Sequence, residues 1–498
     1  MNVNPITRLD YPDPDVIRVE DTYYMVSTTM HFMPGCEILQ SFDLVHWEHV
    51  TYVYETLDHT DAQQLKSGQN IYGQGMWAAS LRYHEGRFYI CFVANDTRKT
   101  YLYTSEKIDG PWKKQLIEGF YHDGSLLFDE DGRNYIVYGN DEIWITELNE
   151  DLTAPKKDGL HRLLVSDHKN PELGYEGSHI QKINGYYYIF LVHSLRDRWM
   201  RTEACFYSDS LEGEFTGGDV LCDDRGYCGQ GVAQGGIVDT PDGKWYAMLF
   251  QDSGAVGRLP ILLPVTWKDH FPFFGQNGHV PKEIEVHSTR PGYIYQPLVG
   301  SDDFCNGLLP RWQFNHDPDP RYYHLDALQG TYTITTREVC TELTQAVNTL
   351  TQRMSYPSCA AEVTVDASAL KEGDVAGLCA LQGCYAAVGI TKHHGKYEVL
   401  MLDKKEDGIL DMTEGTVVES HQMDFRLEAD FCNMKDEARC YYRVNKGDWL
   451  PIGTVHKLYF KLDHFTGCRF GLFCYAAEET GGSACFRDFK YYDVDEIS

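Results

Sequence analysis

The chain has 498 residues, too many for one ordinary hydrophobic core, and its 43% hydrophobic and 24% charged residues are typical of a folded globular protein. A formal net charge of −30, with no basic block, argues against nucleic acid or an anionic membrane as a partner. The first residues lack the apolar core of a signal peptide, and no apolar stretch is long enough to span a bilayer, so we expect a cytoplasmic protein. Fifteen cysteines without a C-x-x-C pair are expected to be reduced core residues, not disulfides or zinc ligands.

A polar turn followed by an aromatic strand recurs five times in the first part of the chain. The five copies are residues 20–26, 85–91, 131–137, 184–190 and 242–248, and a second short strand precedes each turn. Asp-Gly and Asn-Gly between apolar runs are strong hairpin signals, because the tight turn needs positive φ. The turns follow one another at intervals of 46 to 64 residues, which suits four-stranded blades around an axis. The sequence therefore predicts a five-bladed β-propeller over residues 1–300.

The repeated hairpin pattern stops near residue 300, and a different pattern of strands follows. Residues 288–300 form a connection rich in Pro and Gly, and short alternating strands follow it, for example residues 332–336, 361–365 and 397–401. Alternation with turn residues between the strands is typical of two packed antiparallel sheets. We expect an all-β protein in which a β-sandwich over residues 301–498 follows the propeller.

One column of the aligned hairpins carries acidic side chains. Eleven or twelve residues before the shared tyrosine stand Asp13, Ala78, Asp123, Glu176 and Gln234. Equivalent positions on the inner strands of a propeller face one axis, so three carboxylates from three blades would converge, and at least one pKa should rise. A single acid of this kind is more often a turn residue or a surface charge. The shared register of three acids favours acid–base chemistry.

Three segments resemble the motifs of the glycoside hydrolase family 43 enzymes. Residues 10–15, with Asp13 between two prolines, resemble the opening motif; residues 123–126 resemble the middle motif, and residues 175–179 the general-acid motif. Gly124 stands where many members have Pro, a departure that leaves the carboxylate of Asp123 in place. Further landmarks match at residues 75–80, 257–258 and 265–267, and the resemblance continues into a C-terminal, concanavalin-like sandwich.

The resemblance implies a role for each carboxylate. Asp13 would be the general base, Glu176 the general acid, and Asp123 the residue that orients the acid and modulates its pKa. In an inverting glycosidase the acid and the base stand about 6.5–9.5 Å apart, so that a water molecule fits between them. The members resembled are mostly β-xylosidases and α-L-arabinofuranosidases. We expect an exo-acting α-L-arabinofuranosidase, with β-xylosidase as a second activity, that cuts arabino-xylo-oligosaccharides.

Five further side chains are expected at the site. Phe32 and Trp77 would floor the sugar pocket, with core packing as the alternative, and Arg258 would hydrogen-bond sugar hydroxyls. Gln234 stands where many relatives have a His near a calcium ion, and an amide oxygen suits calcium, so a calcium site is expected there. His316, in a proline-stiffened loop, would reach the substrate or the metal region, or else lie on the surface of the second domain.

Two other classes of function compete with hydrolysis. A lectin-like, non-catalytic propeller would keep the aromatic residues but has no need of three converging carboxylates. A related five-bladed propeller enzyme would act on fructans, or on mannosides by phosphorolysis, which requires a cationic phosphate site. Arg196, Arg198 and Arg201 are the candidates for such a site, and they are interpreted more simply as a solvated loop.

Overall fold

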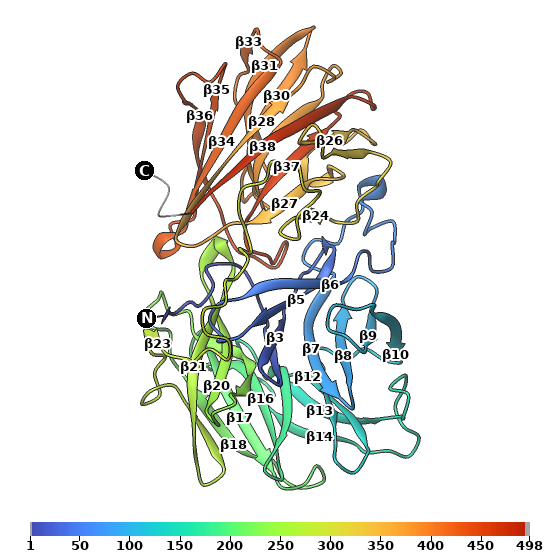
Figure 1. The fold of residues 1–498 in the computed structure, drawn as a ribbon, viewed down its shortest axis with the longest axis vertical. Helices are drawn as coiled ribbons and strands as arrows, with labels where there is room; N and C mark the ends of the chain where they lie inside the picture. Colours follow the sequence, from blue (N-terminus) through green and yellow to red (C-terminus); the bar gives the residue numbers. More distant parts are fainter. Residues whose placement is uncertain (1, 494–498) are drawn as a thin grey trace.

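The computed structural model describes residues 2–493, which fold into a propeller and a sandwich stacked along the long axis of the molecule (Figure 1). The propeller comes first in the chain, and the sandwich lies over one of its faces. Both parts are built from β-strands, and none of the helices described is long and apolar enough to cross a membrane. The predicted all-β architecture, a five-bladed propeller followed by a β-sandwich, is confirmed.

Five four-stranded antiparallel sheets form the blades, and in each the strands pair in chain order. Blade 1 contains β2 (Asp15–Val19), β3 (Thr22–Val26), β5 (Gly35–Ser41) and β6 (Glu48–Tyr54). Blade 2 contains β7 (Met76–His84), β8 (Arg87–Ala94), β9 (Lys99–Ser105) and β10 (Lys113–Ile117). Blade 3 contains β11 (Ser125–Phe128), β12 (Asn134–Asn140), β13 (Glu142–Leu148) and β14 (His161–Ser166).

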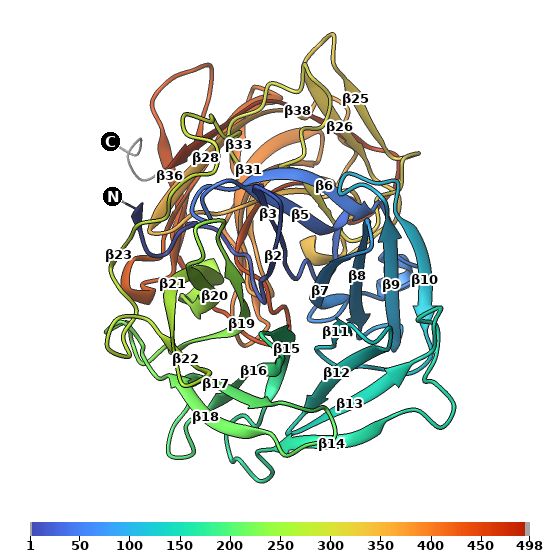
Figure 2. The same cartoon turned by 60° about the horizontal axis from the view of Figure 1, so that its bottom comes forward.

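Blades 4 and 5 complete the ring (Figure 2). Blade 4 contains β15 (Glu176–Ile183), β16 (Tyr186–Ser194), β17 (Arg201–Ser208) and β18 (Thr216–Leu221). Blade 5 contains β19 (Val232–Asp239), β20 (Trp245–Asp252), β21 (Arg258–Lys268) and β22 (Phe271–Phe274). The first strand of each blade lies nearest the axis, and β1 (Asn2–Val3) pairs with β23 (Glu283–Ile284), which ties the two ends of the propeller together.

In blades 2 and 4 the hairpin between the first two strands turns through two residues of positive φ. In blade 2 the turn residues Glu85 and Gly86 have φ of 48° and 77°, and in blade 4 Asn184 and Gly185 have φ of 50° and 83°. Positive φ at both central residues matches the right-handed twist of the strands, and Asn and Gly adopt it readily. The turns of blades 1, 3 and 5 have one residue of positive φ each, Glu20, Gly132 and Gly243, so the hairpin recurs with more than one kind of tight turn.

The sandwich packs a nine-stranded sheet on a seven-stranded sheet around one apolar core. The larger sheet contains β4 (Phe32–Met33), β24 (Gln313–Asn315), β27 (Leu350–Arg353), β29 (Val375–Leu381), β30 (Ala386–His393), β31 (Lys396–Lys404), β32 (Leu410–Met412), β33 (Thr416–Val418) and β37 (Arg469–Tyr475). The smaller sheet contains β25 (Tyr323–Asp326), β26 (Thr331–Thr335), β28 (Ser358–Asp366), β34 (Gln422–Asp430), β35 (Glu437–Arg443), β36 (Leu450–Lys457) and β38 (Ser483–Asp493). Because β4 belongs to the propeller segment of the chain, the larger sheet runs across the border between the two parts.

A buried carboxylate joins the two parts beside the propeller mouth. Asp10 Oδ1 accepts a hydrogen bond from the backbone N–H of Arg258 at 2.7 Å, and Asp10 Oδ2 accepts one from the backbone N–H of Gly467 at 2.8 Å. A Cβ at position 467 would lie 2.7 Å from the Cβ of Asp10, so glycine permits this approach. Asp10 thereby fixes the sandwich loop that ends at Gly467 against the propeller.

Candidate active site

The same backbone position recurs at the inner end of all five blades. Asp13, Ala78, Asp123, Gly177 and Gln234 all have positive φ, between 37° and 66°. In blades 2, 4 and 5 this residue starts a β-bulge, with shifts in pairing after Trp77, Glu176 and Ala233. The sequence alignment was therefore wrong by one residue in blade 4, because Gly177 and not Glu176 occupies the shared column. The bulge is common to these blades, but the hairpin after it spans eleven residues in blades 2 and 4 (Ser80 pairs with Cys91, His179 with Phe190) and twelve in blade 5 (Gly236 pairs with Met248). An alignment that accepts a spacing of eleven or twelve residues therefore cannot separate Glu176 from Gly177.

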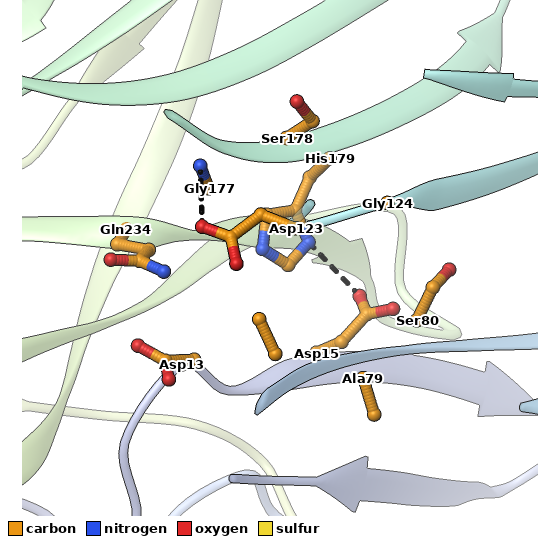
Figure 3. A pocket seen from close by; sticks show the side chains of 11 residues that line it. Asp13, Asp15, Ala79, Ser80, Asp123, Gly124, Gly177, Ser178, His179 and Gln234 are labelled. Carbon is orange, nitrogen blue, oxygen red and sulfur yellow. Dashed lines mark hydrogen bonds and ion pairs between the residues drawn. The ribbon is translucent and has the colours of Figure 1, made fainter. Parts of the chain in front are cut away.

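With this corrected alignment, Glu176 is equivalent to other residues in the neighbouring blades than those predicted. It shares its position with Trp77 in blade 2 and with His122, the residue before Asp123, in blade 3. Trp77, His122 and Glu176 line a cavity of about 650 Å³ at the propeller mouth. Asp13, Asp123 and Gln234 of the inner column line the same cavity, so the structure brings all three predicted carboxylates together. Figure 3 shows Asp13, Asp123 and Gln234 converging from three blades.

The sandwich supplies one wall of this pocket. Met434, Phe460, Lys461, Leu462 and Phe465 line it from above the propeller mouth. The ring of Phe465 lies 4.4 Å from the guanidinium carbon of Arg258 and 5.4 Å from the ring of Trp77. The pocket thus lies between the two parts of the molecule, and its volume is within the usual range for a site that binds a small ligand.

Two donors fix the carboxylate of Asp13, which is almost fully buried. Thr28 Oγ1 donates a hydrogen bond to Asp13 Oδ2 at 2.6 Å, and Arg258 Nη1 donates one to Asp13 Oδ1 at 3.0 Å. The Arg258 side chain is itself buried, at 3% exposure, so this ion pair is screened little by solvent. The arrangement holds Asp13 in one orientation next to a permanent positive charge.

Asp123 and Glu176 form the other acidic group of the pocket. Asn140 Nδ2 donates a hydrogen bond to Glu176 Oε2 at 2.7 Å, and the backbone N–H of Gly177 donates one to Asp123 Oδ2 at 3.1 Å. Burial raises the pKa of Asp123, and the negative charges of Glu176 and Asp13 add to that rise. The prediction that the pKa of at least one of the converging carboxyls rises is therefore supported at Asp123.

The residues of the pocket that sequence reasoning missed include His122, Asn140, Trp199 and Arg201 of the propeller, together with the sandwich residues named above. Arg201 was interpreted as part of a solvated loop, which is wrong, since it is 6% exposed and its Nε donates a hydrogen bond to Asp252 Oδ2 at 2.9 Å. Trp199 lines the pocket and is 44% exposed. His122 carries a sequence signal, because it precedes a column residue as Trp77 does. Arg201 lies on β17, away from the aligned positions, and carries none.

Phe32 and His316 do not line the pocket. Phe32 is fully buried in β4, with the guanidinium carbon of Arg469 3.4 Å from its ring. His316 is also fully buried, its Nε2 accepting a hydrogen bond from the backbone N–H of Ile71 at 3.0 Å. Both expectations are corrected for the same reason: the pairing of β24 with β4 draws these residues into the interface between propeller and sandwich.

The propeller axis holds a second, much smaller cavity of about 10 Å³, which has room for about one water molecule. Gln234 and Asp123 line it, as does Ser178, whose hydroxyl has no hydrogen-bond partner among the residues that the structure describes. Asp15 at its edge is already paired with Arg82 at 2.8 Å and His179 at 3.2 Å. Calcium needs about six to eight oxygen ligands. Neither the space nor the free oxygens of the described residues fit that shell, so the calcium prediction at Gln234 gains no support.

A five-bladed propeller whose mouth gathers three carboxylates in a sugar-sized pocket is the architecture of a glycoside hydrolase. The family model described as glycosyl hydrolases family 43 matches residues 3–272. A second model, described as the beta xylosidase C-terminal concanavalin A-like domain, matches residues 301–492. The chain belongs to glycosyl hydrolases family 43, and the expectation of a glycoside hydrolase is confirmed.

Individual relatives resemble the chain over nearly its whole length. A solved structure described as "Bifunctional GH43-CE" from Bacteroides eggerthii is 41% identical, with a TM-score of 0.92 over 100% of this chain and 64% of that chain. This chain thus spans a little under two thirds of that protein. A GH43 enzyme engineered to display both endo-xylanase and exo-arabinofuranosidase activity is 27% identical, with a TM-score of 0.87 over 99% of each chain. A "Beta-xylosidase" from Formosa agariphila is 26% identical over 99% of this chain and 89% of its own length.

Proposed function

We propose that the chain is an inverting, exo-acting α-L-arabinofuranosidase, with β-xylosidase as a second activity, and that it cuts arabino-xylo-oligosaccharides. The observation that carries the proposal is the placement of Asp13 and Glu176 in one pocket on separate blades, with Asp123 beside them. Separate blades can supply the gap of about 6.5–9.5 Å that an inverting pair needs for its water molecule. The names of the relatives support both a xylosidase and an arabinofuranosidase.

Each carboxylate has a part in a single displacement. Glu176 gives its proton to the glycosidic oxygen while the bond from that oxygen to the anomeric carbon breaks. Asp13 takes a proton from a water molecule while the water oxygen bonds to the opposite face of the same carbon, which inverts its configuration. Thr28 and Arg258 orient the carboxylate of Asp13. The backbone N–H of Gly177 holds Asp123 next to the general acid, Glu176.

The pocket's walls support exo action. Phe460, Leu462 and Phe465 of the sandwich face the blades across the cavity. A wall on that side favours a pocket that admits one terminal or side-chain sugar per cycle over an open cleft along a polymer. Trp77 and Phe465, with ring centroids 5.4 Å apart, supply the apolar faces on which a sugar ring packs.

Two measurements test the proposal. The kcat/KM values for nitrophenyl α-L-arabinofuranoside and nitrophenyl β-D-xyloside, compared side by side, should favour the arabinoside. Proton NMR of the digest should show first the anomer opposite to that of the bond cut. A first product of retained configuration would contradict single displacement, and early release of xylobiose and xylotriose from long xylan would contradict exo action.

A Glu176→Gln variant separates the enzyme from a lectin-like propeller. The enzyme should lose turnover on oligosaccharides and keep binding them, as measured by calorimetry. Measurable sugar binding by the wild-type protein with no turnover of any pentoside would instead favour the non-catalytic alternative.

A further inference from the structure

His122 lies between the two carboxylates at the acid end of the pocket. Its Nε2 is 3.5 Å from Glu176 Oε2 and 3.6 Å from Asp123 Oδ2. The His122 side chain is 21% exposed, but Nε2 itself is buried and has no hydrogen-bond partner in the described residues. The ring nitrogen therefore faces the two carboxylates and no competing acceptor.

The other charges around His122 are distributed unevenly. Asp123, Glu176 and Asp13 are the anions that act on it. The nearby arginines are already engaged, since Arg258 pairs with Asp13 and Arg201 pairs with Asp252. Within the part of the chain that the structure describes, His122 is the one cationic side chain at ion-pair distance from Glu176.

We propose that His122 is a positioning residue for the acid step: as an imidazolium it holds the Asp123 and Glu176 carboxylates in place and stabilises the negative charge that Glu176 gains when its proton moves to the leaving oxygen. The inference rests on the proposed function, since it takes Glu176 as the general acid. No relative's name and no motif of the sequence assigns this residue.

The physical reason is the like charge next to the acid. A Glu176 that has lost its proton is half-buried and faces the buried carboxylate of Asp123, and two neighbouring anions there are costly. A positive charge about 3.5 Å from both offsets that repulsion without taking part in the proton transfer. The carboxylate of Asp123, opposed in part by burial, raises the pKa of His122 to about 9, so the ring carries its charge at neutral pH.

The test compares His122→Asn and His122→Phe with the wild-type protein. Phe keeps an aromatic wall and Asn keeps polarity, but neither carries charge. We expect kcat/KM on oligosaccharides, whose leaving group must be protonated, to fall about 100-fold in both variants. On a dinitrophenyl pentoside, which needs little protonation, the loss should stay within about 3-fold.

The pH profile gives a readout that a purely structural role would not change. Without the positive charge, the carboxylate pair keeps its proton to higher pH, so the alkaline limb of kcat/KM should move up by about 1 pH unit or more. His84→Asn, a replacement on the propeller at a histidine stacked on Phe128, should leave the limb in place and serves as the matched control. An unmoved limb, or equal losses on the two kinds of substrate, would overturn the proposal.

A second measurement keeps the proposal testable if the His122 variants fail to fold. In protein labelled at histidine 13Cε1, the His122 resonance should titrate near pH 9 in the wild type. In the Glu176→Gln variant the same His122 resonance should titrate at lower pH. An unchanged titration in that variant would contradict the pairing. If instead the wild-type protein turned over no pentoside at all, the proposed function would fail, and the titration would still report on the pair.

Discussion

The pocket and the domain interface each bury a group of ionisable side chains, and the two groups have opposite electrostatics. In the pocket, His122 stands beside Asp123 and Glu176, and its pKa is raised to about 9. At the interface, three histidines pack around Tyr72 and are at most 3% exposed: His31, His316 and His464. Ring centroids there are 4.8 Å apart for His31 and His316, and 5.1 Å for His31 and His464.

The difference lies in the counter-charges. Burial lowers the pKa of each of the three interface histidines, that of His464 to about 3, and within residues 2–493 no carboxylate is a main influence on them. The neighbouring Arg469 lowers it further at His31 and His464. A buried group without an opposite charge stays neutral and packs, whereas a buried group beside opposite charges stays ionised and can do chemistry. Burial by itself therefore does not mark a catalytic group.

The largest effect is expected at Asp13. Asp13→Ala should lower kcat by about 10³-fold or more on every substrate, activated ones included, because water activation is lost whatever the leaving group. Steady-state kinetics on nitrophenyl and dinitrophenyl pentosides measure it, with the circular dichroism spectrum as the control for folding, because the loss of Asp13 leaves the buried Arg258 unpaired and lowers the melting temperature. Turnover retained within about 10-fold on the activated substrate would remove Asp13 from the base role.

Glu176 should show a loss that depends on the leaving group. Glu176→Ala should lower the activity about 10³-fold on oligosaccharides and about 10-fold on a dinitrophenyl pentoside, since a good leaving group departs with little protonation. A series of aryl pentosides of graded acidity measures the dependence. Equal losses along the series would tell against the acid assignment.

The interface histidines should make the protein acid-sensitive. The pKa of His464 is about 3 in the folded state, against an ordinary value of 6.5. Between these two pH values the histidine is protonated in the unfolded state and neutral in the folded state. Stability is therefore lost as pH falls below about 6.5, by about 2 kcal/mol per such histidine at pH 5. His464→Phe should lose less stability than the wild type between pH 7.5 and pH 5, measured by urea unfolding. Parallel losses in the two proteins would mean that His464 does not titrate on unfolding.

Asp10 links the two regions and should show a smaller effect. Asp10→Asn keeps an acceptor for one of the two backbone N–H groups, of Arg258 and Gly467, and gives up the other. We expect a loss of about 10-fold in kcat/KM, as the loop that carries Phe465 moves relative to Arg258. The alkaline limb of the pH profile should stay in place, unlike that of the His122 variants. A shifted limb would mean that Asp10 acts on the acid electrostatically.

The smallest effect is expected from removal of divalent ions. The axis cavity has room for about one water molecule, and Asp15 at its edge is paired with Arg82 and His179. Exhaustive dialysis against EDTA should leave kcat and the melting temperature unchanged, and calcium added back should not change either. A clear rise in either value on calcium addition would restore the metal prediction at Gln234.

The sequence by itself determined the hairpins, their five-fold repetition and hence the architecture, because turn chemistry and strand alternation are local properties. It also identified Asp13, Asp123, Glu176, Trp77 and Arg258 as residues of one site, all of which line the pocket. Only the tertiary structure decided the register at Glu176, since the hairpins span eleven residues in blades 2 and 4 and twelve in blade 5, and only the strand pairing shows which span applies. Residues far apart in the chain also meet only on folding: Phe465 contacts Arg258, Arg201 pairs with Asp252, and His316 is buried against Ile71 at the interface between propeller and sandwich. Such contacts depend on how two domains pack, which no local pattern in the chain records.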